Sequence, residues 1–177
     1  VDSVRFHSIM EYELDEALLS ATSYFRYNRV QLLPFFSLGF DPHTEDAKSR
    51  SVGAQLKYRR DVFATFRFIV GVDIDYTSGK RTDVAITPVE VGDIFESFIS
   101  GDVVYDFDVD YISISPYVHG EWQATDRLRF TAGLRFDYNE YDYQNNLTDV
   151  LTTGVRHKRP ASQNVDFDHF TPKAGLT

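Results

Sequence analysis

The segment LRFTAGLRFDYNEYDY, residues 128–143, alternates between apolar and polar side chains almost without a break. Successive side chains of an extended chain point to opposite faces, so the segment predicts a strand with one apolar and one charged face. The apolar set is Leu128, Phe130, Ala132, Leu134, Phe136 and Tyr138. Such a strand would be about 50 Å long, whereas strands of soluble proteins usually have about 5–6 residues. Its length calls for an environment that a small soluble domain does not provide.

The same alternation recurs along the chain and predicts about seven strands. They are expected at residues 3–14, 18–28, 51–59, 62–76, 106–122 and 128–143, with a last strand that runs to Thr177. Long connections are expected at 29–50, 78–105 and 144–164. Short turns that alternate with long loops are typical of a transmembrane β-barrel, with apolar side chains toward lipid and polar ones toward the lumen. We therefore predict an all-β fold, an antiparallel up-and-down meander that forms part of a large barrel.

Composition excludes several other classes of protein. The chain of 177 residues has no run of 18 apolar residues, as a membrane-spanning helix would need, and no cysteine for disulfides. Its formal net charge of -9 argues against nucleic acid as a partner, since binding phosphates needs a basic surface. Two alternatives stay open, namely a soluble β-sandwich binding module and a small non-transporting outer-membrane barrel, because both also show alternating strands.

The sequence offers no enzyme site and no metal site. Neither GxSxG nor HExxH occurs, and Ser115 and His119 would lie about 13 Å apart along one strand, too far for a hydrogen bond. Asp106, Asp108 and Asp110 share one strand face, but an extended chain cannot wrap one ion with all three. We expect no catalytic residue, no metal ligand and no cofactor. Asp73 and Asp75 are expected to pair across the sheet with Lys57 or Arg67.

Two further features concern the faces of the strands. Aromatic residues near the ends of the apolar stripes match an interfacial girdle; they are Tyr27, Tyr58, Tyr76, Trp122 and Tyr138. In the strand at 106–122 the apolar residues are odd-numbered up to Tyr111 and even-numbered from Ile112 onward. Either a β-bulge near these two residues absorbs one position, or the first part of the strand lies above the membrane.

Two motifs resemble a known family. SPYVHGEWQATDRLRFTAGLRFDYNEYDY, residues 115–143, contains a strand ending in Glu121 and Trp122, a turn and a long alternating strand. FDHFTPKAGLT, residues 167–177, follows after a loop. Together they closely resemble the mid-barrel region of TonB-dependent outer-membrane receptors, in which strands such as LTLTAGLRYDY and FSPKLGLTY occur in this order.

The resemblance implies energised uptake of a scarce nutrient across the bacterial cell outer membrane, most often a ferric siderophore. It implies a 22-stranded barrel closed by an N-terminal plug domain, and partners that include outer-membrane lipid, an extracellular ligand and the TonB complex. We expect residues 1–177 to be a partial barrel segment without the plug domain. About seven strands also fit a segment, because bacterial single-chain barrels have an even number of strands, from about 8 upward.

Residues that select the ligand are expected in the long loops, because a ligand that arrives from outside meets these surfaces first. The connection at 29–50 and the RHKR run at 156–159 supply aromatic and basic side chains. The candidates are Arg29, Phe35, Phe36, His43, Arg156, His157, Lys158 and Arg159. The RHKR run would attract an anionic chelate or a lipopolysaccharide phosphate, or it is simply a solvated loop.

Overall fold

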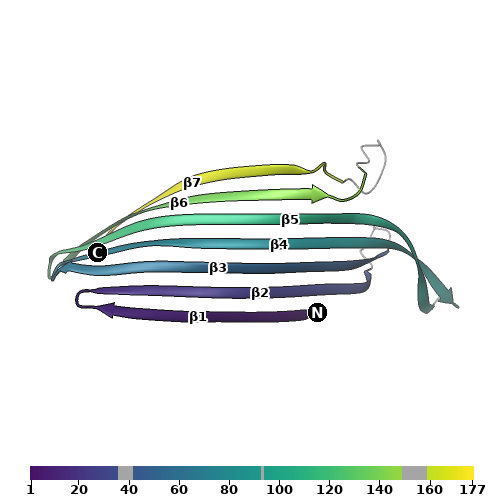
Figure 1. Cartoon of the computed structure of the whole chain (residues 1–177), viewed down its shortest axis with the longest axis horizontal. Helices are drawn as coiled ribbons and strands as arrows, with labels where there is room; N and C mark the ends of the chain where they lie inside the picture. Colours follow the sequence, from purple (N-terminus) through teal and green to yellow (C-terminus); the bar gives the residue numbers. More distant parts are fainter. Residues whose placement is uncertain (36–41, 93, 149–158) are drawn as a thin grey trace.

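The computed structural model describes residues 1–35, 42–92, 94–148 and 159–177. These residues form one antiparallel sheet in which the seven strands lie side by side in chain order (Figure 1). The strands are β1 (Asp2–Leu14), β2 (Ala17–Phe35), β3 (His43–Phe63), β4 (Phe66–Val91), β5 (Ile94–Thr125), β6 (Leu128–Asn145) and β7 (Gln163–Leu176). The predicted up-and-down meander is therefore confirmed. No helix among the described residues is long and apolar enough to cross a membrane.

The strands are longer than the sequence pattern predicts. The expected connections at 29–50 and 78–105 are largely strand, because the hydrogen-bonded ladder continues beyond the point where apolar alternation stops. β4 and β5 together form a hairpin that extends past its neighbours and bends away at the far end (Figure 1). Its turn contains Gly92, whose φ of 59° lies in the left-handed region that glycine adopts without steric cost.

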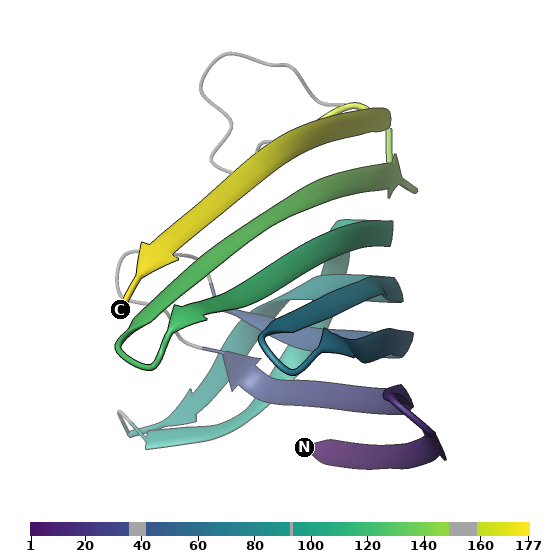
Figure 2. The ribbon, with the colours of Figure 1, turned by 90° about the vertical axis from the view of Figure 1, so that its left-hand side faces the viewer.

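The sheet is a single layer with almost no buried apolar core. Among the described residues, Ile86 is the only buried hydrophobic side chain, and it is 6% exposed. Figure 2, a view along the strands, shows β1 and β7 at opposite edges of this one twisted sheet. A soluble sandwich would bury one face of each sheet against a second layer, and no second layer is present among these residues.

One face of the sheet, here called the outer face, is apolar and exposed. On β4 it consists of the even-numbered residues from Phe66 to Tyr76, and their cross-strand partners on β5 run from Trp122 to Ile112. Trp122 is 50% exposed and Ile74 is 42% exposed. This stripe spans about 33 Å along the strand, or about 23 Å when tilted by about 45°, close to the apolar band of about 25 Å of membrane barrels.

The expected girdle residues lie on this outer face. Tyr27, Tyr58, Tyr76, Trp122 and Tyr138 all belong to cross-strand rows that contain other outer-face residues. Tyr76 and Tyr138 each donate a hydrogen bond from the phenol to a carboxylate, Asp110 and Glu140 respectively. An aromatic ring over hydrocarbon with its hydroxyl in a polar layer is the arrangement expected at a membrane boundary.

Candidate functional site

The opposite face of the sheet, here called the inner face, carries most of the polar side chains between the short turns and the upper end of the apolar stripe. Its residues are even-numbered on β2 and odd-numbered on β3 to β7, as the registers between neighbouring strands require. A wet barrel lumen favours such a face, because polar groups there keep contact with water. The candidate functional site is built on this face.

A tyrosine and an aspartate connect three strands on the inner face. Tyr24 on β2 extends across Gly53 on β3 and donates a hydrogen bond to Asp75 on β4. A Cβ at Gly53 would clash with the Tyr24 ring, with Cε1 at 2.6 Å. Arg26 Nη2 lies 3.3 Å from the same carboxylate, and Thr77 donates to it at 2.9 Å. Glycine is therefore required at position 53 for the ring to reach Asp75.

A second tyrosine also lies over a glycine of the neighbouring strand, but here the tyrosine belongs to the later strand of the pair. Tyr117 on β5 lies over Gly71 on β4, where an added Cβ would clash with the phenol ring and would also stand 2.6 Å from the Leu56 carbonyl oxygen. Beside it, Arg135 on β6 reaches Asp73 on β4 and Asp137 on its own strand, at 2.7 Å each. The Tyr117 ring and the Arg135 ion pairs thus connect β4, β5 and β6 along the inner face.

The predicted partners of the two aspartates are therefore wrong. Asp73 pairs with Arg135 and Asp75 with Arg26, whereas the nearest acid to Arg67 is Asp61, at 2.7 Å. Arginine side chains extend diagonally across more than one strand, so they reach carboxylates that are not in the directly opposite position.

The two faces exchange character above the apolar stripe. Beyond Ile112 the outer face of β5 carries Asp110, Asp108 and Asp106, while the inner face carries Tyr111, Val109 and Phe107. The register between β4 and β5 is continuous from Trp122 to Tyr105, so no bulge lies at residues 111–112. The predicted bulge is wrong, and the alternative, a strand that rises above the membrane, fits the structure.

The inner-face aromatic residues at this level lie in neighbouring cross-strand rows of β5, β6 and β7, and together we call them the aromatic surface. Its ring pairs are Phe107 with Tyr143 at 5.3 Å, Tyr111 with Tyr141 at 4.6 Å, and Tyr141 with Phe167 at 6.0 Å between centroids. Tyr141 is 40% exposed and Phe167 is 50% exposed. A polar wall that ends in exposed rings offers apolar contact area to a ligand that enters from the loop side.

A buried ion pair lies at the base of the extended hairpin. Asp83 on β4 is fully buried and accepts hydrogen bonds from Arg81 Nε at 3.0 Å and Nη2 at 2.8 Å. These bonds raise the pKa of the Arg81 guanidinium, which also lies 3.2 Å from Glu45. His43 Nε2 is 3.8 Å from Asp83. Because Glu45 and His43 belong to β3, these contacts join β3 to β4 close to the point where the register between β4 and β5 first shifts, at Asp83 and Val84.

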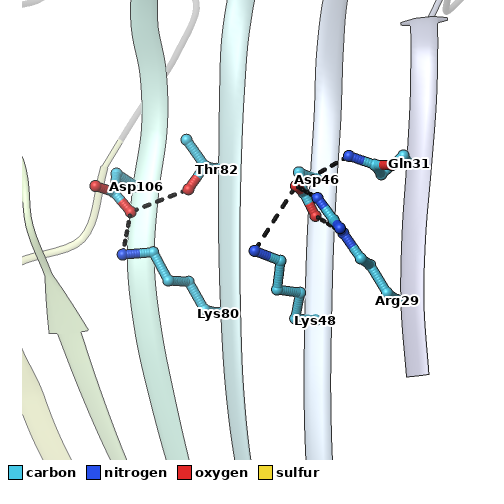
Figure 3. A network of polar contacts seen from close by, with 7 residues as sticks. All are labelled: Arg29, Gln31, Asp46, Lys48, Lys80, Thr82 and Asp106. Atoms are coloured by element: carbon cyan, nitrogen blue, oxygen red, sulfur yellow. Dashed lines mark hydrogen bonds and ion pairs between the residues drawn. The ribbon is translucent and has the colours of Figure 1, made fainter. Parts of the chain in front are cut away.

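A separate polar network lies on the outer face above the apolar stripe (Figure 3). Arg29 binds Asp46 through Nε at 3.1 Å and Nη2 at 2.7 Å, and Gln31 donates to the same carboxylate at 3.2 Å. The Arg29 hydrogen bonds are the main cause that lowers the pKa of Asp46. Lys80 lies 3.4 Å from Asp106. This network faces away from the inner wall.

The candidate ligand residues do not form one group. Arg29 lies on the outer face, His43 lies on the inner face beside Asp83, and Phe35 ends β2 opposite His43. Phe36, Arg156, His157 and Lys158 lie outside the described residues. Within the described part of the chain, Arg159 Nε is buried without a hydrogen-bond partner. A role in ligand binding stays a prediction for all eight.

The aromatic surface and the tyrosine–glycine contacts were missed by sequence reasoning. A signal for the aromatic surface was present in the sequence: the odd-numbered Phe107, Val109 and Tyr111 alternate with three aspartates, which marks a change of environment. No signal in the sequence marked the tyrosine–glycine contacts, because the register between β2 and β3 must be known before Tyr24 can be placed opposite Gly53.

Comparison with known proteins identifies the family. The sequence model described as "TonB dependent receptor-like, beta-barrel" matches residues 2–177, which is nearly the whole chain. The chain belongs to the TonB-dependent receptor family. It is a barrel segment of such a receptor, and members of this family are outer-membrane transporters and not enzymes. No curated protein matches the sequence.

Solved structures support the same fold for this TonB-dependent receptor segment. The copper transporter OprC superposes with a TM-score of 0.69 at 14% sequence identity. The siderophore receptor PiuA from Acinetobacter baumannii superposes with a TM-score of 0.65 at 16% identity. The open form of the ferric-catecholate import receptor Fiu from E. coli K12 superposes with a TM-score of 0.59 at 14% identity. Each match covers 98% of this chain. The chain spans 27%, 29% and 32% of the OprC, PiuA and Fiu chains respectively.

Proposed function

We propose that the receptor containing this segment lies in the bacterial outer membrane and takes up a ferric siderophore with energy from the TonB complex. In this role, residues 1–177 supply barrel wall, outer-face contacts with lipid and part of the surface that the ligand meets first. The family supports the transport role, and two of the similar structures are a siderophore receptor, PiuA, and a ferric-catecholate import receptor, Fiu.

The observation that carries the proposal is the exchange of faces above Tyr76 and Ile112. A barrel wall in lipid needs apolar side chains outside, yet at the loop end the rings turn inward and the carboxylates outward. Above these residues both faces of the sheet are in contact with water, so lipid does not stabilise rings on either face. They gain contact with a ligand that has apolar or aromatic surfaces, as many metal chelates have.

The geometry of the paired rings favours a ligand with a flat surface. Tyr111 and Tyr141, the closest pair, are tilted by 36° and lie side by side on neighbouring strands. Tyr111 is held by a hydrogen bond from its hydroxyl to Asn139 Oδ1 at 2.7 Å. A ring fixed in this way loses little freedom when a flat ligand packs on it, which favours binding.

The test uses the full-length receptor in detergent, with a ferric tricatecholate chelate as probe and binding followed by tryptophan fluorescence. The variant Tyr111→Ala with Tyr141→Ala should weaken binding by about tenfold, since each aromatic contact contributes about 0.5–1.5 kcal/mol. The control variant, Tyr76→Ala with Tyr138→Ala, removes two outer-face tyrosines near the same height and should leave affinity unchanged.

Two results would refute the proposal. Equal affinity in the inner-face and outer-face variants would remove the aromatic surface from ligand binding. Failure of the wild-type receptor to bind any ferric chelate, combined with tight binding of cupric ion added as a second probe, would replace the siderophore with copper as the substrate.

A further inference from the structure

Above the apolar stripe, the charged side chains of the outer face are divided by sign between two neighbouring groups of strands. In the regular part of the ladder on β2 to β4 they are mostly basic, and we call this group the basic half: Arg29, Asp46, Lys48, Arg50 and Lys80. On β5 and β6 they are all acidic, and we call this group the acidic half: Asp106, Asp108, Asp110, Glu140 and Asp142. Figure 3 shows the boundary, where Lys80 on β4 lies 3.4 Å from Asp106 on β5.

These charges keep their surroundings when the barrel is complete. Each strand from β2 to β6 is paired with a neighbour on both sides, so closure of the barrel adds no strand beside them. A plug domain inside the barrel would contact the inner face and leave the outer face uncovered. The division of charge therefore belongs to the outer wall of the complete receptor.

The two halves lie at the same level above the membrane. Counted along each strand from its girdle tyrosine toward the long loops, the charges are two or four residues higher: Arg29 above Tyr27, Lys80 above Tyr76, and Glu140 and Asp142 above Tyr138. Two and four residues are about 7 and 13 Å along a strand, or about 5 and 9 Å in height at a tilt of about 45°. The halves therefore form one charged band just above the hydrocarbon.

Like charges lie directly opposite each other within each half. Lys48 on β3 is opposite Lys80 on β4, and Asp110 on β5 is opposite Asp142 on β6. Like charges in opposite positions on neighbouring strands are destabilising. Lys48 is partly compensated by Asp46 at 3.9 Å, whereas Asp142 makes no ion pair among the residues that the structure describes. Each half would therefore be stabilised by a surface of the opposite sign.

A surface of a single sign complements only one of the two halves. An anionic lipid leaflet would attract the basic half and repel the acidic half, and a cationic surface would do the opposite. A second copy of the same chain carries both signs. Two copies inserted in the same orientation form a closed pair only about a two-fold axis along the membrane normal. This rotation reverses the order of strands across the contact and keeps every residue at its height, so the basic half of each copy faces the acidic half of the other.

We propose that the outer face of β3 to β6 is an interface between two copies of the receptor, related by a two-fold axis at the boundary of β4 and β5. Because both barrels are convex, the strands beside the axis approach most closely, and Lys80 of one copy lies nearest to Asp108 and Asp110 of the other. The apolar stripe below, from Phe66 to Tyr76 on β4, continues the contact in the hydrocarbon. The opposed charges give the pair its specificity and its orientation.

The test measures energy transfer between two dye-labelled populations of the full-length receptor, in phosphatidylcholine vesicles that contain EDTA and no lipopolysaccharide. The dye is attached at Asp126→Cys, in the short turn between β5 and β6, after replacement of any cysteine elsewhere in the receptor. Wild-type copies should show energy transfer that rises with the protein-to-lipid ratio and reaches the plateau of one-to-one pairing. Raising NaCl from about 0.05 M to about 0.5 M should weaken the pairing, because salt screens charges at an aqueous surface.

Two charge-reversal variants test the complementarity. Lys48→Glu with Lys80→Glu reverses the basic half, and Asp110→Lys with Asp142→Lys reverses the acidic half. Each variant alone should pair at least about tenfold more weakly than the wild type, because like charges then face each other across the axis. Mixed in equal amounts, the two variants should pair with each other within about threefold of the wild-type affinity, since each reversed half then faces a reversed half of the opposite sign. A folding defect would not be repaired by mixing.

The control variant Lys57→Glu with Lys173→Glu makes the same reversal on the inner face and should pair as the wild type does. The inference is overturned if wild-type copies do not pair, if the outer-face and inner-face variants pair equally well, or if the two reversed variants do not pair with each other. Pairing that requires added lipopolysaccharide and magnesium ions would also overturn it, because the charged band would then bind lipid through bridging cations. The measurement needs no ligand, so its outcome is separable from that of the proposed function.

Discussion

A lysine placed in the middle of the outer-face stripe should destabilise the protein in lipid far more than a lysine placed above the stripe. Val70 is 39% exposed and lies on the outer face of β4, four residues from Phe66 and six from Tyr76. At about 3.3 Å per residue and a tilt of about 45°, it lies about 9 Å from the lower edge of the apolar band and about 14 Å from the upper edge.

At this depth Val70→Lys should reduce the free energy of unfolding by about 2–4 kcal/mol, the cost of a lysine near the bilayer midplane. Ser78→Lys, on the same strand and the same face but above Tyr76, should cost only about 0–1 kcal/mol. Reversible guanidinium unfolding of the full-length receptor in phosphatidylcholine vesicles, followed by tryptophan fluorescence, gives both values.

Equal costs for the two lysines would refute the assignment of the outer face to lipid. A larger cost for Ser78→Lys would do so even more directly. As an internal check, the same two variants in detergent above its critical micelle concentration should differ less, because a micelle adapts its shape around a buried charge.

Two further predictions concern polar contacts. Gly53→Ala should destabilise the folded protein by about 1–3 kcal/mol, because the new Cβ displaces the Tyr24 ring from Asp75. Gly79→Ala, also on the inner face, is the control and should be tolerated, because the nearest atom to its new Cβ would be 3.6 Å away. Equal thermal midpoints for the two variants would argue against the contact between Tyr24 and Gly53. The lowered pKa of Asp46 means that the Arg29–Asp46 pair stabilises the fold above the unfolded-state pKa of about 3.9 and loses this effect as pH falls through the lower folded-state pKa. Asp46→Asn should therefore flatten the fall of the thermal midpoint below about pH 4, and an unchanged profile would mean that the pair contributes nothing.

Sequence periodicity predicted the part of the fold that lies in lipid. The alternation from Phe66 to Tyr76 was enough to place β4, because each apolar side chain on that face must contact hydrocarbon. The extent of β4 beyond Tyr76 was not predictable in this way. Above the membrane no solvent boundary imposes alternation, yet backbone hydrogen bonds still hold β4 to β5 as far as Val91.

The candidate site was predictable only in outline. Polar residues at inward positions followed from the same alternation, but which charges meet depended on the register and on diagonal reach, as Arg135 and Asp73 show. The aromatic surface was present in the sequence as a change of phase at Tyr111 and Ile112, which two explanations fitted equally well. Continuous pairing between β4 and β5 decided between them.

Which face of the sheet meets lipid decides whether this segment is barrel wall, and the accessibility of side chains along β4 measures this directly. The sequence has no cysteine, so single cysteines can be introduced along residues 70–82 of the segment and spin-labelled, after replacement of any cysteine elsewhere in the receptor. In vesicles, labels at Val70, Val72 and Ile74 should collide with oxygen dissolved in lipid, and labels at Asp73 and Asp75 with a water-soluble nickel complex. Gly71 is left unlabelled, because a side chain there would clash with the Tyr117 ring. Above Tyr76 both faces should be accessible to nickel. A reversed phase, or equal accessibility at neighbouring positions within the stripe, would contradict the barrel-wall account.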